Sequence, residues 1–329
     1  MPQKIKRLFL LFALFACLAT PVCAEENKEL IPVGSTVGIA LSSDEVVIAA
    51  LSDTVSAARD AGLKQGDILL KINETDIRCV ADVTRVLHSS TPVNTVTVAR
   101  KGLEKTMKIR PQETAGGQAL GIYVRDSIAG VGTVTYYDPE DGSFGALGHG
   151  VNDAQSQKRM RITGGELVEA SVAEIKKGKC GQPGALRGLL GTHVLGSVNA
   201  NTGVGVFGTL ESFIPERSAV PVAERSQVHT GNAEILCTLC DGKTQAYRVR
   251  IAQVHISETD TKNFLVKVED ERLLSQTGGI VQGMSGSPIL QNGRLIGAVT
   301  HVLIDDPTTG YGIFIGNMLD RAETVKKAA

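Results

Sequence analysis

The sequence has no tryptophan, and aromatic residues make up only 4% of its 329 residues. Neither sign of charge dominates, since 34 lysines and arginines are balanced by 35 acidic residues. A chain without a basic excess gives no global reason to expect a nucleic-acid partner. Glycine is abundant instead, with 36 residues, and frequent glycine favours a β-rich fold with many tight turns.

The chain also lacks an apolar run of the roughly 20 residues that cross a bilayer comfortably. Its N-terminus carries a shorter run, Leu8–Ala19, behind the basic residues Lys4, Lys6 and Arg7. Small residues follow and end at Ala24. This order is typical of an export signal that is cleaved after Ala24, and an uncleaved run would act as an anchor. We therefore expect residues 1–24 to be an export signal or membrane anchor.

Metal-binding patterns are scarce in the exported part. Cys237 and Cys240 have C-x-x-C spacing, but no second pair and no H-x-x-H partner accompany them. Structural zinc sites need four ligands, so this single pair supports a metal only weakly. We predict that these residues, with Cys79 and Cys180, are structural thiols or form a disulfide. The sequence thus indicates no metal and no cofactor.

Residues 29–111 read as one small domain. A strand at Val46–Ile48 is followed by a short helix, a glycine turn and a further strand that ends at Asn73. A helix with one apolar face follows at Ala81–His88, and two strands complete the unit. The run A-G-L-K-Q-G-D-I-L-L-K-I-N at 61–73, in this order of elements, resembles a PDZ domain.

The resemblance to a PDZ domain implies peptide capture by β-strand addition. We expect the strand after Gly38-Ile39-Ala40-Leu41 to offer an open edge, with the N–H groups of that loop holding a terminal carboxylate. The alternative is that these four residues are only the start of a strand. Residues 112–118 are polar and contain glycine, so they are predicted to be a linker. Short strands with glycine turns fill 119–329, as in an all-β barrel or sandwich.

A serine in a glycine-rich turn is the strongest chemical signal. Ser285 lies between Gly283 and Gly286 in a G-x-S-G-x-P pattern that is typical of chymotrypsin-like serine peptidases. The nucleophile elbow of α/β-hydrolases would need glycine where Ser287 stands. The N–H groups of Gly283 and Ser285 could stabilise an oxyanion. The alternative is an ordinary turn before a hairpin, because Asn292-Gly293 separates two apolar runs.

A serine nucleophile needs a general base within hydrogen-bond reach, and histidine is the usual one near neutral pH. Among the 6 histidines, His149 is best placed, because Gly148 and Gly150 flank it at the end of an apolar strand. His193, in Gly-Thr-His-Val-Leu-Gly, is a competitor. A lone histidine at a strand end is usually structural, so His149 would not establish the site by itself.

Three segments together resemble the stage IV sporulation protein B peptidases. They are F-G-A-L-G-H-G at 144–150, G-G-I-V-Q-G-M-S-G-S-P-I at 278–289, and the closing stretch A-V-T-H-V followed by D-P-T-T-G-Y-G-I. Members of this family are exported serine peptidases with a membrane-targeting segment, a PDZ domain and a chymotrypsin-like catalytic domain. The resemblance therefore implies a mostly β fold with an N-terminal PDZ domain and a β-barrel peptidase domain.

The resemblance further implies a triad of His149, Asp270 and Ser285. Ser285 would attack the scissile carbonyl, His149 would transfer the proton, and Asp270 would orient the imidazole. Glu269 and Glu271 are immediate rivals of Asp270, and Asp241 is a further alternative. The spacing is unusual, because Asp270 precedes Ser285 by only 285 − 270 = 15 residues whereas His149 precedes it by 285 − 149 = 136.

The family resemblance implies signalling rather than bulk digestion. Such enzymes are released across the forespore membrane into the intermembrane space, where they trim themselves near the N-terminus. They then cut a membrane-bound regulator of an intramembrane metalloprotease that processes a late sigma factor. Residues 25–35 are the natural place for self-cleavage, and the PDZ domain would bind peptide C-termini or this N-terminal segment. The alternative is a non-catalytic PDZ adaptor whose peptidase-like domain only binds.

Overall fold

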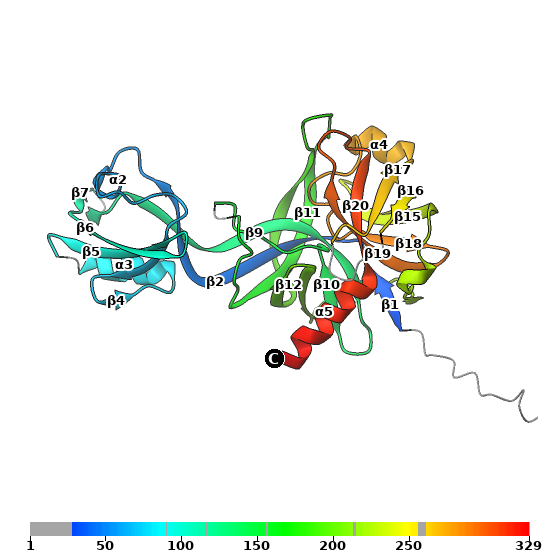
Figure 1. The fold of residues 1–329 in the computed structure, drawn as a ribbon, viewed down its shortest axis with the longest axis horizontal. Coiled ribbons are helices and arrows are strands. Elements are labelled where there is room, and N and C mark those ends of the chain that lie inside the picture. The colour runs from blue at the N-terminus through cyan, green and yellow to red at the C-terminus, as the bar shows by residue number, and fades with distance from the viewer. Residues whose placement is uncertain are drawn as a thin grey trace, which may run out of the picture.

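The computed structural model describes residues 28–328, apart from residues 90, 116, 156, 213–214 and 256–260. The fold is dominated by strands, which form two barrels side by side and a smaller unit at the end of a long two-stranded arm (Figure 1). The expected export signal, residues 1–24, lies outside the described residues. Within the described part, no helix is both long enough and apolar enough to cross a membrane.

The first barrel is a closed ring of six strands. They are β2 (Thr36–Leu51), β9 (Ile122–Tyr137), β10 (Ser143–Ala146), β13 (Gly205–Leu210), β12 (Ala185–Thr202) and β11 (Gly164–Lys176). The ring closes because β2 pairs with β11 along one edge and with β9 along the other. Alternating apolar residues of these strands, such as Ile39, Val134 and Val206, point inward and form its core. The short strands β1 (Glu29–Pro32) and β14 (Val220–Pro221) extend the sheet beside β9.

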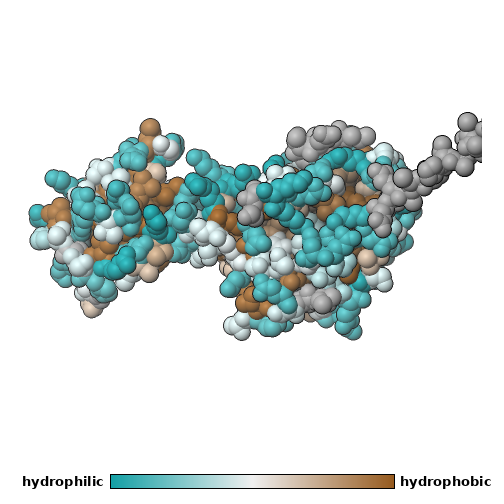
Figure 2. All heavy atoms as spheres, turned by 90° about the horizontal axis from the view of Figure 1, so that it is seen from below, coloured by the Kyte–Doolittle hydropathy of each residue, from teal (hydrophilic) through white to brown (hydrophobic). Residues whose placement is uncertain are grey.

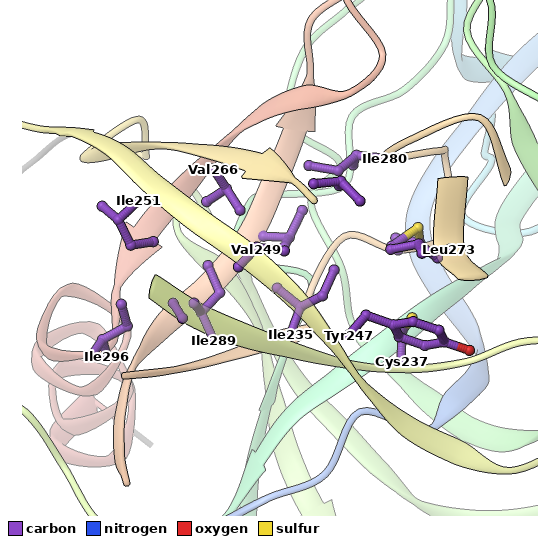
Figure 3. Packing of buried hydrophobic residues seen from close by; sticks show 14 of the residues in the cluster. Ile235, Cys237, Tyr247, Val249, Ile251, Val266, Leu273, Ile280, Ile289 and Ile296 are labelled. Atoms are coloured by element: carbon purple, nitrogen blue, oxygen red, sulfur yellow. The ribbon is translucent and has the colours of Figure 1, made fainter. Parts of the chain in front are cut away.

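The second barrel is also closed and has six strands. They are β15 (Gly231–Thr238), β16 (Thr244–Val254), β17 (Phe264–Val268), β20 (Thr309–Phe314), β19 (Arg294–Val302) and β18 (Pro288–Gln291). Figure 3 shows its core, in which Ile235, Val249 and Ile289 point toward one another from different strands. The turn between β18 and β19 confirms the hairpin predicted from Asn292-Gly293, because both residues have positive φ, 52° and 75° respectively, as expected for such a turn.

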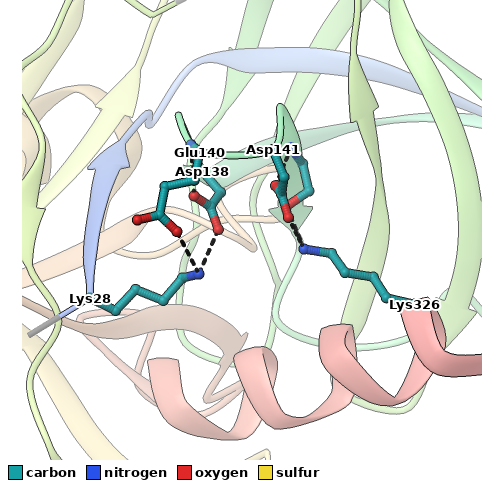
Figure 4. Close-up of polar contacts among 6 residues, drawn as sticks. Lys28, Asp138, Glu140, Asp141 and Lys326 are labelled. Atoms are coloured by element: carbon teal, nitrogen blue, oxygen red, sulfur yellow. Dashed lines mark hydrogen bonds and ion pairs between the residues drawn. The ribbon is translucent and has the colours of Figure 1, made fainter. Parts of the chain in front are cut away.

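Three short helices complete this half of the chain: the 3₁₀ helix η1 (Arg225–Gln227), α4 (Glu271–Thr277) and α5 (Ile315–Ala328). Lys326 on α5 pairs with Asp141, while Lys28 at the start of the described chain pairs with Asp138 at 2.8 Å. Both lysines therefore approach the same turn between β9 and β10, one from each end of the chain (Figure 4). These pairs hold the N-terminal strand and the C-terminal helix against the first barrel.

The smaller unit has its own core and lies between β2 and β9 in the chain. It contains α2 (Ala57–Asp60), β3 (Ile68–Ile72), β4 (Thr75–Asp76), α3 (Val80–His88), β5 (Asn94–Arg100), β6 (Leu103–Ile109), β7 (Gln112–Thr114) and β8 (Gly117–Ala119). Val83 and Val86 on the apolar face of α3 pack on Leu69 and Val96 of the sheet. Asp67, which is 1% exposed, is neutralised by Arg100 at 2.6 Å. Figure 2 shows hydrophilic residues over most of one face of both lobes.

The domain boundaries differ from those expected from the sequence. Residues 29–42 do not belong to the small unit. β1 pairs with β9 and β14, and the first half of β2 is one of the strands of the first barrel. Residues 112–118 are not a free linker but form most of the β7–β8 hairpin, which leads to the buried Leu120 of the small core. The small unit is thus an insertion into the β2–β9 hairpin. The insertion begins after Ser42 and ends before Ser127, which are paired with each other.

Candidate active site

Ser285 lies in the turn that leads from α4 to β18. Two glycines beside it have backbone angles that favour glycine, with φ of 98° at Gly283 and 96° at Gly286. A β-carbon on Gly286 would come within 2.0 Å of the Thr133 carbonyl oxygen, so the turn lies directly against β9 of the first barrel. The G-x-S-G pattern therefore brings the nucleophile of the second barrel to the surface of the first.

His149 approaches the same place from the first barrel. It follows β10 after Leu147 and Gly148, whose φ values of 69° and 67° turn the chain sharply. A β-carbon on Gly148 would lie 2.9 Å from the Thr300 methyl group, so this turn touches β19 of the second barrel. His149 and Ser285 line one cleft of about 810 Å³.

The histidine is held in a form that suits a general base. Its Nδ1 lies 2.9 Å from the Gly150 carbonyl oxygen, and only a protonated Nδ1 can donate to that acceptor. Nε2 is then left with its lone pair, ready to take a proton. Burial lowers the pKa of His149, and the Gly150 carbonyl offsets part of this effect. The imidazole is therefore neutral at pH 7.

The serine hydroxyl has a different partner in this structure. Ser285 Oγ donates to the Thr300 carbonyl oxygen at 2.7 Å. His149 lines the same cleft, and catalytic hydrogen bonds often form or tighten only when substrate binds. The arrangement is therefore that of a resting site, in which the two reacting groups share a cleft.

The two backbone groups predicted to stabilise an oxyanion are available. Among the described residues, neither the Gly283 N–H nor the Ser285 N–H donates to a protein acceptor, whereas the Met284 N–H between them bonds the Val281 carbonyl at 3.1 Å. Preorganised N–H donors beside a nucleophile are what stabilises a tetrahedral intermediate.

Asp270 is not part of this cleft. Its carboxylate caps α4 by accepting from the Arg272 N–H at 3.0 Å, and it also accepts from the Arg248 N–H at 3.2 Å. The Arg272 guanidinium binds both carboxylate oxygens and holds the pKa of Asp270 well below its ordinary range. Asp270 lines a separate hollow with Glu234 and Arg248. The triad role expected for Asp270 is therefore corrected to that of a helix cap.

The alternative acids are not in the cleft either. Glu269 pairs with Arg250 at 2.6 Å, and Glu271 lines the same hollow as Asp270. Asp241 accepts from the neighbouring Lys243 N–H and the Gln245 amide. No carboxylate lines the cleft among the described residues, so the Gly150 carbonyl occupies the orienting position in this structure. Sequence spacing could not show this, because the orienting group is backbone.

The comparisons with known proteins identify the family and its domains. A family model described as SpoIVB peptidase S55 matches residues 116–319, and a PDZ model matches residues 26–99. The chain belongs to the SpoIVB peptidase S55 family. It is therefore a serine endopeptidase with an N-terminal PDZ domain.

Several solved structures are similar to this S55 peptidase, although distantly. The active form of the Rv3671c protease from M. tuberculosis is 15% identical, with a TM-score of 0.37 over 60% of this chain and 74% of that one. A serine-to-alanine variant of the HtrA-type protease AlgW with a decapeptide is 10% identical, with a TM-score of 0.39 over 89% of this chain and 64% of that one. A search of curated proteins gave no significant match. The family match remains the basis of the assignment.

A second histidine lies in the S55 site and was passed over in the sequence. His301, on β19, has its ring centroid 5.0 Å from that of His149. His301 is exposed at the mouth of the cleft, but partial desolvation there, with His149 and Lys262 nearby, lowers its pKa to about 4. The sequence signal for His301 was the predicted hairpin. The strand that follows Asn292-Gly293 must run back past the Ser285 turn, and His301 lies on this strand. His193, the competitor of His149, is exposed on β12 and does not line the cleft.

The peptide-binding edge expected in the PDZ domain is also corrected. Gly38, Ile39, Ala40 and Leu41 pair with β9 on one side and with β11 on the other, so their backbone groups are used within the first barrel. A loop of similar character lies elsewhere, at Leu120-Gly121-Ile122, where Gly121 has φ of 79°. The strand that follows pairs with β2 along one edge and contacts α3, whose Val80 N–H donates to Asp126 at 2.8 Å.

Proposed function

We propose that this S55 peptidase acts in a signalling pathway of endospore formation. It would be exported across the forespore membrane and remain membrane-associated through residues 1–24 until it trims itself. It would then cut a membrane-bound regulator and so release an intramembrane metalloprotease that processes a late sigma factor. Family membership and the export-signal pattern at the N-terminus support this role.

One observation supports the catalytic part of the proposal above all others. His149 and Ser285 come from different barrels and line a single cleft, next to two N–H groups without a protein acceptor among the described residues. Ser285 Oγ would attack the scissile carbonyl while His149 Nε2 takes its proton. The N–H groups of Gly283 and Ser285 would stabilise the oxyanion, and His149 would then protonate the leaving amine. Water would release the acyl group by the same steps.

The structure restricts where self-trimming would occur. Residues 29–35 were included in the expected segment, but Leu30 is fully buried and β1 is paired with both β9 and β14. A peptidase needs an extended segment that its cleft can accept, so a cut within β1 would first require this strand to leave the sheet. We infer that the scissile bond precedes Lys28, which is anchored to Asp138.

The lining of the cleft indicates which substrates it would accept. Apolar side chains predominate, among them Ile39, Leu41, Ile128, Val131, Ile280, Val281 and Ile304. Arg159 also lines the cleft, and a β-carbon on Gly150 would lie 3.3 Å from its Cδ, so it is on the side of His149. We therefore infer a preference for an extended apolar segment that carries an acidic residue near the scissile bond.

The PDZ domain would dock a peptide as an added strand. Residues 122–126 of β9 pair only with β2 among the described strands, so their other edge is open beside α3. A peptide C-terminus or the N-terminal segment of this chain could extend the sheet there, with the Leu120-Gly121-Ile122 loop at its end. This replaces the docking position first expected at Gly38-Ile39-Ala40-Leu41.

Mass spectrometry of the purified full chain tests this function. The wild-type protein should lose a fragment that ends before Lys28 and should be labelled at Ser285 by a fluorophosphonate probe. Ser285→Ala should do neither while keeping its thermal unfolding temperature. A folded wild-type chain that is neither trimmed nor labelled would instead favour a non-catalytic PDZ adaptor.

A further inference from the structure

Thr133 joins the catalytic turn to the first barrel. It lies on β9 and is 1% exposed. Its hydroxyl donates to the Gly283 carbonyl oxygen at 2.9 Å, and its N–H donates to the Ser285 carbonyl oxygen at 3.1 Å. Its own carbonyl accepts from the Leu147 N–H at 3.2 Å, two residues before His149. One residue thus touches both segments that carry the catalytic side chains.

The two bonds that Thr133 donates lie on either side of one oxyanion donor, the Ser285 N–H. Fixing the Gly283 carbonyl fixes the peptide group that follows Gly283, and fixing the Ser285 carbonyl fixes the group that follows the nucleophile. The Ser285 N–H lies between these two held carbonyls along the chain. Gly283 has no side chain that would restrict its backbone, so an external hydrogen bond is needed to keep one conformation. Preorganised donors stabilise an oxyanion only if they are held in place.

We propose that Thr133 is a positioning residue for the oxyanion site of this peptidase. Its hydroxyl holds the Gly283 peptide so that the N–H groups of Gly283 and Ser285 converge on the same point in the cleft. It does not touch substrate and transfers no proton. The proposal rests on the serine-peptidase function of Ser285 and names the side chain that keeps its turn in the active conformation.

The same strand provides a matched control. Thr135 lies two residues further along β9 and is fully buried like Thr133. Its hydroxyl, however, has no hydrogen-bond partner among the described residues. Thr→Val removes a hydroxyl at nearly constant volume in both positions. Only at position 133 does this leave an unsatisfied carbonyl in the catalytic turn, so the two variants separate a local effect of the hydroxyl from a general effect on β9.

The experiment compares Thr133→Val, Thr133→Ser and Thr135→Val in the full chain. Three rates or affinities are measured: self-trimming, fluorophosphonate labelling of Ser285, and binding of a peptide boronate whose oxygen enters the oxyanion site. We expect Thr133→Val to lower each by roughly 10- to 100-fold, the effect of losing one buried hydrogen bond at a site of charge development. Thr133→Ser should restore most of the loss, because it keeps the hydroxyl, and Thr135→Val should resemble wild type.

Thermal unfolding and pH dependence complete the test. A Thr133→Val chain that unfolds at the wild-type temperature, keeps the wild-type pH profile of labelling and still loses boronate binding would establish a positioning role. Equal losses in Thr133→Val and Thr135→Val, or no rescue by Thr133→Ser, would overturn it. These outcomes are distinct from failure of the proposed function, in which the wild-type chain itself would not be labelled.

Discussion

The two barrels differ in how far apart in the sequence their paired strands lie. All six strands of the second barrel come from residues 231–314, and neighbours in its ring are mostly neighbours in sequence. The first barrel is closed by β2 and β9, between which the whole PDZ domain is inserted. Ser285 therefore lies on the locally built barrel, and His149 lies on the barrel whose closure depends on a distant pairing.

The loop after His149 shows what this difference means for the site. Asn201 of β12 holds it by accepting from the Val151 N–H and donating to the Met160 carbonyl. Arg125, on the part of β9 that reaches the PDZ domain, binds Asp153 and Gln155 of the same loop. The position of the base is thus tied to the strand that forms the PDZ edge, whereas the Ser285 turn is tied to the barrels alone.

The largest effect is expected from removing the base that the first barrel supplies. His149→Ala should lower self-trimming and fluorophosphonate labelling by at least about 10³-fold, because the other imidazole in the cleft, His301, has its pKa lowered to about 4 and is a weaker base. The unfolding temperature should stay near that of wild type. His193→Ala, at an exposed position of β12, is the control and should retain full activity.

The contact between the two barrels is broken by Gly286→Ala. The added methyl group would meet the Thr133 carbonyl oxygen at 2.0 Å, in a backbone conformation with φ of 96°. We expect the free energy of unfolding to fall by about 3 kcal/mol or more and labelling to be lost. Gly293→Ala also has positive φ but meets nothing within 4 Å, so it should cost only about 1 kcal/mol and leave labelling intact. Similar stabilities for the two variants would contradict this account of the barrel contact.

Asp270→Asn distinguishes the helix-cap role that the structure gives Asp270 from the triad role that the family resemblance implies. As an orienting acid, Asp270 would be worth on the order of 10⁴-fold in rate. As the cap of α4, it should have little effect on chemistry, because asparagine is also a good N-cap. We expect self-trimming within about fivefold of wild type and a loss of about 1 kcal/mol in stability from the Arg272 ion pair. A 10⁴-fold loss with an intact fold would restore the triad role.

Titration of His301 should make the cleft sensitive to acid. Its folded-state pKa of about 4 lies below the ordinary value of 6.5. The unfolded chain therefore binds the proton more readily, and this group destabilises the fold as pH falls from about 6.5 toward 4. His301→Asn should lessen the drop in unfolding temperature over this range and change little at pH 8. His193→Asn, at an exposed position, should leave the drop in unfolding temperature unchanged. Equal behaviour of the two variants would argue against a depressed pKa at His301.

The smallest effect is expected at Arg159, which lines the first-barrel side of the cleft. Arg159→Gln should slow cleavage of peptides with an acidic residue near the scissile bond by a few-fold, and the difference should fade at high salt, because an exposed charge pair is weak and screened. Matched peptides with glutamine in place of glutamate provide the control. Identical rates on both peptide sets would exclude a charge preference on this side.

Local patterns in the sequence pointed to Ser285 and His149, which the structure places in one cleft. Asn292-Gly293 needs positive φ at both positions, which makes a hairpin almost unavoidable, and the glycine turns at Ser285 and His149 leave both side chains accessible. The separation of β-rich PDZ and peptidase parts was equally visible. These features depend on residues that are close together in the chain, so a single sequence contains the information.

The features that were mispredicted depend on distant residues. Gly38-Ile39-Ala40-Leu41 looks like the start of a free PDZ strand until β11, more than 100 residues away, pairs with it. The acid of the expected triad, Asp270, was implied by the family resemblance, and only the packing of α4 shows that Arg272 and the helix end already engage it. Strand pairing at long range leaves little trace in a single sequence, because the same alternation fits several partners.

The insertion of the PDZ domain decides how it could be removed experimentally. Cutting the chain after the PDZ domain would also remove β1 and the first half of β2. The first barrel would then lose the strand that pairs with both β9 and β11. An internal excision that rejoins Ser42 to Ser127 through a two-residue turn would shorten the arm and leave the ring of strands closed. The PDZ domain is inserted at the tip of a hairpin. A catalytic core without it therefore requires an internal deletion rather than an N-terminal truncation.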